Sequence, residues 1–238
     1  MAGGNNISRM SPRQKMINLM YIVLTALLCL NVSSDVLIGY NQVHVGLHHT
    51  NSNLAAKNEV QFLYLQNLYE NNPAKVGAWF EKGKDLREVS ASLCLTIDSL
   101  KTAIARQADG EDGDPYNLDN QDDLEAAAVT MLRPGTNEGT KLRKRVDGFR
   151  NYVSTLISDS AKRNAVVNML STDVAGKKTD MVSKSWETKN FDKMPAIAAV
   201  TILTKLENDI RQAEGEALTD LITNVGIGDV RVNELDAY

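Results

Sequence analysis

The chain has 238 residues and a formal net charge of -4, and aromatic residues make up only 5% of it. An acidic chain lacks the basic excess that nucleic-acid binding requires, so nucleic acid is excluded as a leading partner. Few aromatic residues and modest Gly and Pro content favour helices over a β-sandwich. The two cysteines are Cys29 and Cys94, and Cys29 lies in an apolar run, so no disulfide framework is expected.

The first predicted helix begins at Pro12. Ser11 can cap it, and Gln14 completes a capping box, while proline suits the first helical position. Residues 16–32 that follow contain no charged side chain. A hydrocarbon core needs about 20 such residues. Extended by the next few residues, this run predicts a transmembrane helix over 16–36.

The charges flanking this run set its expected orientation. Arg9, Arg13 and Lys15 precede it, whereas the first basic residue beyond it is Lys57. The positive-inside rule therefore places residues 1–15 in the cytoplasm and the rest of the chain outside it. A cleaved signal peptide and a buried core helix are the competing interpretations. The length of the run and its asymmetric charges favour a single-pass anchor.

Polar residues form one stripe along this predicted span. The stripe consists of Gln14, Asn18, Tyr21, Thr25 and Cys29, which are spaced 4-3-4-4 and so share one helical face. Polar groups facing lipid are costly, so the stripe is expected to face another helix or a water-filled path. The alternative is an anchor with ordinary helix packing, in which Arg13 snorkels at the cytoplasmic boundary.

The span contains no Asp or Glu. A proton-driven machine that used this helix would therefore need its titrating carboxylate from a partner. Arg13 is the expected counter-charge, because a guanidinium stays protonated at physiological pH.

The next predicted helix continues from residue 37 to Asn71, where Asn72 and Pro73 begin another. Its apolar positions follow a 4-3 spacing typical of a coiled coil that needs a partner helix. These positions are Val36, Tyr40, Val43, Leu47, Thr50 and Leu54. The helix from Pro73 has a similar rhythm and ends at an acidic loop that begins at Asp109.

The remaining segments complete a predicted all-α bundle over 37–224. A short helix is expected over 122–132, a long one over 138–170, a polar loop over 171–193 and a last helix from Pro195 to Asn224. The glycine-containing stretch 225–232 is expected to break the helix. We predict that 225–238 is a linker or the start of a β-rich domain.

No motif predicts catalysis, a cofactor or a metal site. His44 and His48 are one helical turn apart, which suits Zn²⁺, but a third ligand is missing nearby. The acidic loop lacks the glycine and final glutamate of a calcium-binding EF-hand. Nucleophile elbows, zinc-protease motifs and phosphate-binding loops are also missing from the sequence. The sequence therefore does not indicate an enzyme.

Several motifs resemble one family. The segment 12–21 reads PRQKMINLMY, and its apolar continuation ends in LNVS at 30–33. Two later stretches, 123–139 and 185–210, agree with the same pattern. The chain is similar to the N-terminal part of GldM/PorM, a subunit of the motor that powers type IX secretion and gliding.

This resemblance implies a periplasm-spanning subunit in the inner membrane. It implies a homodimer whose membrane helices sit within a ring of a two-span protein of the GldL/PorL type. Arg13 and Tyr21 match the family's motor residues, and proton flow at that interface would move the periplasmic shaft. The resemblance also implies further β-rich domains that contact outer-membrane components and that are absent from this sequence. The runner-up function is an anchored periplasmic ligand sensor.

Overall fold

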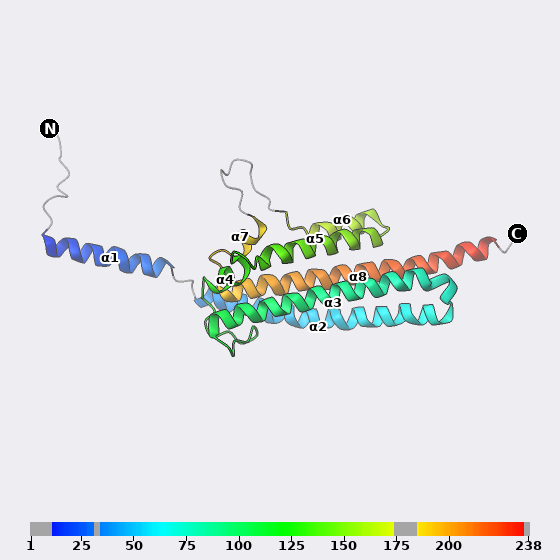
Figure 1. Cartoon of the computed structure of the whole chain (residues 1–238), viewed down its shortest axis with the longest axis horizontal. Coiled ribbons are helices and arrows are strands. Elements are labelled where there is room, and N and C mark those ends of the chain that lie inside the picture. The colour runs from blue at the N-terminus through cyan, green and yellow to red at the C-terminus, as the bar shows by residue number, and fades with distance from the viewer. Residues whose placement is uncertain (1–10, 31–33, 174–184, 236–238) are drawn as a thin grey trace, which may run out of the picture.

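The computed structural model describes residues 11–30, 34–173 and 185–235, without the side chains of 26–30 and 227–235. Every regular element in these ranges is an α-helix and the described residues contain no β-strand, so the predicted all-α class is confirmed. The structure places three long helices side by side, with a shorter layer against them (Figure 1).

Helix α1 (Pro12–Leu30) lies apart from the other helices (Figure 1). It begins as predicted, because the backbone N–H of Gln14 donates to Ser11 Oγ at 3.3 Å. Among the described elements it contacts no other helix, so its apolar side chains are exposed, including Met20 at 70%.

No helix within the described ranges combines the length and apolar character needed to cross a membrane. The predicted span over 16–36 is described only in part, since residues 31–33 lie outside the described residues.

The bundle core is formed by α2 (Ser34–Asn71), α3 (Pro73–Asp109) and α8 (Ala196–Leu235). The junction between α2 and α3 is as predicted. Asn72 Oδ1 accepts a hydrogen bond from the Lys75 N–H at 3.3 Å, and Pro73 takes the first helical position, where it needs no N–H partner. Contacts between α2 and α8 advance in the same direction along both helices, so these two helices run parallel. Contacts of α3 with α8 advance in opposite directions, from Gly83 beside Leu218 to Lys101 beside Glu207, so α3 runs antiparallel to both.

Apolar side chains from all three helices fill the core. Leu65 of α2, Leu86 and Ile97 of α3, and Ile210 and Leu221 of α8 are fully buried. Each such side chain stabilises the fold by about 1.5–3 kcal/mol relative to exposure. The apolar rhythm predicted for this helix corresponds to its buried face, although Val89 stays 43% exposed.

Four shorter helices form a second layer. They are α4 (Ala126–Leu132), α5 (Glu138–Leu156), α6 (Ser160–Met169) and α7 (Trp186–Phe191). Phe149 of α5 and Phe191 of α7 are buried in this layer. The α5–α6 hairpin runs along α8, as Figure 1 shows.

The prediction of a single helix over 138–170 was wrong, because the chain breaks after Leu156. Asp159 caps the new helix α6 by accepting from the Ala161 N–H at 2.7 Å. Asp220 of α8 accepts the N–H of Ser158 at 2.9 Å. These acceptors satisfy backbone groups that a break exposes, so the turn is stable where periodicity alone indicates continuation.

Two other sequence predictions also need correction. The predicted loop 171–193 contains α7, whose first turn is capped because Ser185 Oγ accepts from the Thr188 N–H at 3.3 Å. The predicted helix break at 225–232 is absent, and α8 continues to Leu235. Val225 is buried at 5% exposure, so packing carries the helix past Asn224. Extending a formed helix outweighs the cost of about 1 kcal/mol for each glycine.

Candidate functional site

The predicted coiled-coil seam of α2 is correct in half of its positions. Tyr40, Leu47 and Leu54 are partly buried, whereas Val36 and Val43 remain 48% and 53% exposed and Thr50 is exposed. The fully buried positions beside them are instead polar. They are His44, Asn51 and Asn58, which recur every seven residues.

These residues belong to a buried polar seam where α2, α3 and α8 meet. We define the polar seam as His44, Asn51, Asn58, Lys101, Thr204, Glu207, Asn208, Arg211 and Glu214. Buried polar groups cost stability unless they are hydrogen-bonded, so the partners of each group decide what the seam does.

The two asparagines of α2 bind α8 through paired amide contacts. Asn51 Nδ2 donates to the Thr204 carbonyl at 3.1 Å, and Asn51 Oδ1 accepts from Asn208 Nδ2 at 2.9 Å. Two helical turns further along α2, Asn58 Nδ2 donates to the Arg211 carbonyl at 2.8 Å. It also donates to Glu214 Oε2 at 3.1 Å. These contacts fix the register of α2 against α8.

A charged centre joins α3 to α8. Lys101 Nζ lies 2.8 Å from Glu207 Oε2 and 2.7 Å from Asp98 Oδ1, and Lys101 is 0% exposed. The other oxygen of Glu207 accepts two hydrogen bonds from the Arg211 guanidinium, at 2.9 and 2.8 Å. A buried charge at this depth is stable only because it is paired and hydrogen-bonded.

The pKa directions follow from this pairing. Burial opposes the ammonium of Lys101, yet hydrogen bonds to Asp98 and Glu207 outweigh it and raise the Lys101 pKa. Burial likewise opposes the Glu207 carboxylate, but hydrogen bonds from Lys101 and Arg211 lower its pKa. Both groups therefore stay charged inside the bundle.

His44 occupies the end of the seam nearest α1. Its ring is 0% exposed, is stacked on Tyr116 with centroids 5.4 Å apart, and has Nδ1 3.0 Å from Thr204 Oγ1. Burial and the nearby charge of Lys101 lower its pKa from 6.5 to about 4. His44 is therefore neutral at physiological pH. In the described residues no group of His, Cys, Asp or Glu gathers as a metal site.

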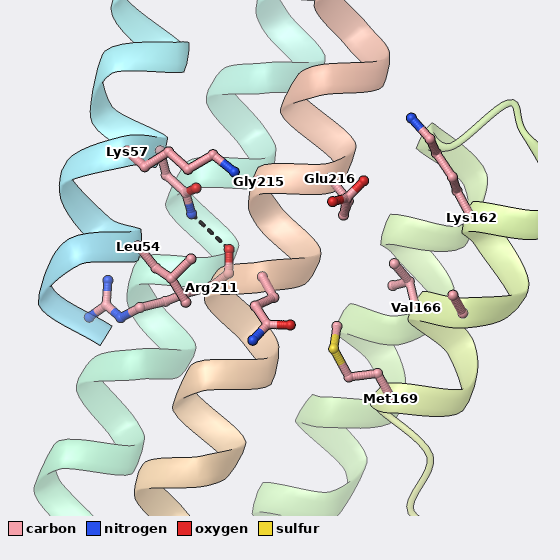
Figure 2. Close-up of a pocket in the computed structure, with 11 residues that line it drawn as sticks. Leu54, Lys57, Lys162, Val166, Met169, Arg211, Gly215 and Glu216 are labelled. Carbon is pink, nitrogen blue, oxygen red and sulfur yellow. Dashed lines mark hydrogen bonds between the residues drawn. The ribbon is translucent and has the colours of Figure 1, made fainter. Parts of the chain in front are cut away.

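A groove opens beside the polar seam, between α2 and α6 with α8 as its floor (Figure 2). Its volume is about 520 Å³. The lining combines apolar side chains with charged ones: Leu54, Lys57, Asn58, Lys162, Ala165, Val166, Met169, Arg211, Gln212, Gly215 and Glu216. The α2 and α6 helices do not contact each other, so the groove is open between them.

The predicted motor residues lie together on α1 and apart from this groove. Arg13, Gln14, Asn18, Tyr21 and Thr25 are all exposed in the structure, Tyr21 at 73%. Thr25 Oγ1 donates to the Tyr21 carbonyl at 2.6 Å, which satisfies the hydroxyl within the helix. The Cys29 side chain lies outside the described residues. A partner role for this stripe stays a prediction.

Helices α2 to α8 correspond to a known domain. A family model described as the GldM N-terminal domain matches residues 35–224, which is most of the chain. The chain belongs to the GldM family. The GldM match begins at the start of α2 and extends into α8, so it includes the whole polar seam. A search of curated proteins found no match.

Sequence reasoning missed the polar seam of this GldM domain. The spacing of His44 and His48 suggests only a pair of metal ligands, and no sequence motif singles out Asn51 or Asn58. A usable signal was present, because polar residues recur at 44, 51 and 58 and again at 204, 208 and 211 in the last helix. Matched polar interruptions in two long amphipathic helices indicate that those helices pair.

Proposed function

We propose that this chain is a periplasm-spanning subunit of the proton-driven inner-membrane motor that powers type IX secretion and gliding. The observation that carries this proposal is the GldM N-terminal domain over 35–224, directly preceded by α1 with its PRQKMINLMY motif. A bundle without a catalytic constellation in its described residues suits a mechanical role better than an enzymatic one.

The first part of the proposal is that α1 and the residues after it anchor the chain in the inner membrane. Support comes from the exposure of apolar side chains on α1. Between Met16 and Leu24, the Met, Ile, Leu and Val side chains are 51–70% exposed. Such exposure is unfavourable in water and is removed in lipid. The N-terminus is then cytoplasmic and the bundle periplasmic, as the flanking charges predict.

The second part is assembly as a homodimer inside a ring of a two-span GldL/PorL-type protein. Val36 and Val43 continue the seven-residue spacing of α2 but lie exposed at the edge of the bundle. Residues at such spacing need a partner helix, and a second α2 would supply one. The C-terminal domains implied by the family would carry the contact with outer-membrane components.

The third part concerns the working residues. Arg13 is the counter-charge for a partner carboxylate, and Tyr21 lies on the same stripe with Gln14, Asn18 and Thr25. A charge that crosses the membrane is worth about 2.3 kcal/mol per 100 mV, so a few protons per step supply mechanical work.

The test replaces Arg13 in cells and measures secretion of a type IX substrate and colony spreading. Arg13→Ala is expected to abolish both while the protein stays at its normal level in the membrane. Arg133→Ala removes the same charge from an exposed turn of the bundle and serves as the matched control, with activity unchanged. Normal secretion by a normally expressed Arg13→Ala variant would falsify the motor role.

A second candidate function is favoured by the groove between α2 and α6, which suits a membrane-anchored ligand sensor. Co-purification from solubilised membranes separates the two proposals. A dimer held by several copies of a small two-span protein supports the motor, whereas a monomer without such a partner supports the sensor.

A further inference from the structure

The loop after α3 lies at the end of the bundle nearest α1 (Figure 1). Part of it is a closed turn, residues 114–117, which we call the Tyr116 turn. The N–H groups of Tyr116 and Asn117 donate to the side chain and the carbonyl of Asp114, each at 3.0 Å. These bonds lie within the turn itself, so the turn can move as a unit without breaking them.

Tyr116 packs over three side chains of the polar bundle. Its ring is stacked on His44 with centroids 5.4 Å apart, lies 4.5 Å from the His48 ring, and is 6.0 Å from Lys101 Nζ. His44 and Lys101 are 0% exposed, whereas Tyr116 is 45% exposed. Tyr116 therefore separates these two buried groups from solvent on its side of the bundle.

The hydrogen bonds of His44 determine which ring nitrogen carries the proton. The hydroxyl of Thr204 donates to the Val200 carbonyl at 2.9 Å, so its oxygen accepts from His44 Nδ1–H at 3.0 Å. A neutral imidazole has one N–H, and Nε2 therefore carries the lone pair. This Nε2 is buried and has no hydrogen-bond partner in the described part of the chain. His44 is thus a buried base whose lone pair faces no donor there.

The surroundings of His44 oppose a positive charge. Burial, Lys101 and His48 lower its pKa by more than the Pro115 carbonyl and Glu207 raise it. The charged and titratable groups near the His44–Tyr116 stack come from every element packed there: His48 of α2, Lys101 and Asp98 of α3, Glu207 of α8, and Asp114 of the Tyr116 turn. Both carboxylates near Lys101 are already paired with it. An imidazolium at His44 is therefore a second buried cation without a carboxylate of its own.

The Tyr116 turn is the part of these surroundings that moves at the lowest cost. The three long helices are joined through the polar seam, for example by Asn51 to α8 and by Lys101 to Glu207. Tyr116, in contrast, is held on His44 by ring stacking and is already half exposed. Moving this ring outward hydrates His44 without separating any pair of helices.

We propose that the Tyr116 turn is a proton-operated gate over the polar seam. A proton from solvent binds Nε2 of His44, which creates a second cation beside Lys101, and the Tyr116 turn moves outward so that water reaches the imidazolium. Release of that proton to solvent restores the neutral ring and the stacked, closed state that the structure describes. The membrane-facing placement of this gate rests on the proposed function, whereas the gate itself does not.

The test follows ring signals of the purified full chain in detergent by NMR, with 13C-labelled histidine and tyrosine. The chain has only three histidines, so single substitutions assign their signals. We expect His44 to titrate between the pKa of about 4 for the closed state and the 6.5 of an exposed imidazole, and nearer the lower value because moving the turn opposes proton uptake. The Tyr116 ring signals should shift with the same midpoint, while circular dichroism shows unchanged helix content.

Variants identify which groups form the gate. His44→Gln should abolish the shift of the Tyr116 signals, and His49→Gln, an exposed neighbour on α2, should preserve it. Tyr116→Ala removes the cover and should raise the His44 midpoint by about one pH unit or more. Tyr116→Phe keeps the stacked ring and should leave that midpoint unchanged.

Four results would each overturn the proposal. His44 could titrate while the Tyr116 signals stay fixed, which would mean that the Pro115 carbonyl accommodates the imidazolium in place. The Tyr116 shift could persist in His44→Gln, or Tyr116→Ala could leave the His44 midpoint unchanged. Helix content could also fall with the same midpoint, which would indicate unfolding of the bundle. Because these measurements involve no ring partner and no membrane potential, their failure leaves the motor proposal untouched, and failure of the Arg13 test leaves the gate untouched.

Discussion

Helix α1 and the inner face of α2 differ in a way that runs against simple hydropathy. The apolar side chains of α1 are exposed, whereas α2 buries His44, Asn51 and Asn58 against α8. In α2 every buried polar residue finds at least one hydrogen-bond partner inside the chain. In α1 the described apolar side chains find no partner helix within it.

The two helices therefore differ in where their side chains find partners, inside the chain for α2 and outside it for α1. The polar seam makes its hydrogen bonds within one chain, although His44 Nε2 and Asn58 Oδ1 have no partner in the described residues. Its contacts fix the register and orientation of the bundle. The apolar surface of α1, in contrast, is covered only if it contacts lipid or another protein. A buried polar seam is therefore evidence about folding, and an exposed apolar helix is evidence about surroundings.

The largest effect on stability is expected at the charged centre of the polar seam. Lys101→Met leaves Glu207 buried with only Arg211 as its ion-pair partner, so we expect a loss of about 3–4 kcal/mol in the free energy of unfolding. Urea denaturation of the purified chain measures it. Lys84→Met, on an exposed part of α3, should change stability by less than about 0.5 kcal/mol. A loss below about 1 kcal/mol at Lys101 would mean that the seam is not needed for folding.

His44 should make the bundle sensitive to acid. Its pKa is about 4 in the folded chain and near 6.5 when unfolded, so the unfolded chain binds a proton first. Stability is then fully present above pH 6.5 and falls by about 3 kcal/mol as pH drops towards 4.

Unfolding measured from pH 7 to pH 4 tests this. His44→Gln should have a shallower pH dependence than the parent chain, and His49→Gln, an exposed neighbour on the same helix, should keep the parental slope. Parallel curves for all three proteins would show that protonation of other groups governs acid stability.

A smaller effect is expected at Gly215. Gly215→Ala places a Cβ 2.7 Å from Asn58 Oδ1 and forces the amide from its bonds to α8, which should cost about 1–2 kcal/mol. Gly148→Ala lies in α5 with open space around it and should instead stabilise by up to about 1 kcal/mol. Thermal melts of the two variants should therefore shift in opposite directions.

The smallest effect on the stability of the bundle is expected when α1 is removed. Removal of residues 1–33 should leave the unfolding midpoint of the bundle unchanged in the same detergent, because α1 contacts no other described helix. A clear fall in the midpoint would show that α1 packs on the bundle in solution.

The sequence predicted some of these features for identifiable physical reasons. The α2–α3 junction was predictable because Asn72 and Pro73 carry a local capping signal. The break after Leu156 was not, because Asp220, which satisfies the exposed backbone there, lies 62 residues away along the chain. The continuation of α8 past Asn224 was also missed, since Val225 is held by packing rather than by helix propensity.

The candidate sites divide in the same way. The stripe of α1 was visible from spacing alone, because one helix defines one face. The groove was not visible, because it depends on how far α6 stands from α2. The polar seam beside it was missed for a similar reason, because it depends on hydrogen bonds between helices far apart in the sequence, such as Asn58 with Glu214.

The parallel arrangement of α2 and α8 has a mechanical consequence. The chain enters the bundle through α2 at the end nearest α1 and leaves through α8 at the far end (Figure 1). Tension between the two termini would therefore load the α2–α8 interface in shear rather than peel it open. The contacts of Asn51 and Asn58 with α8 would have to rupture together rather than in succession. At about 1.5 Å per residue, the 40-residue α8 spans roughly 60 Å, so a pull or twist at one end would reach the other with little loss to stretching.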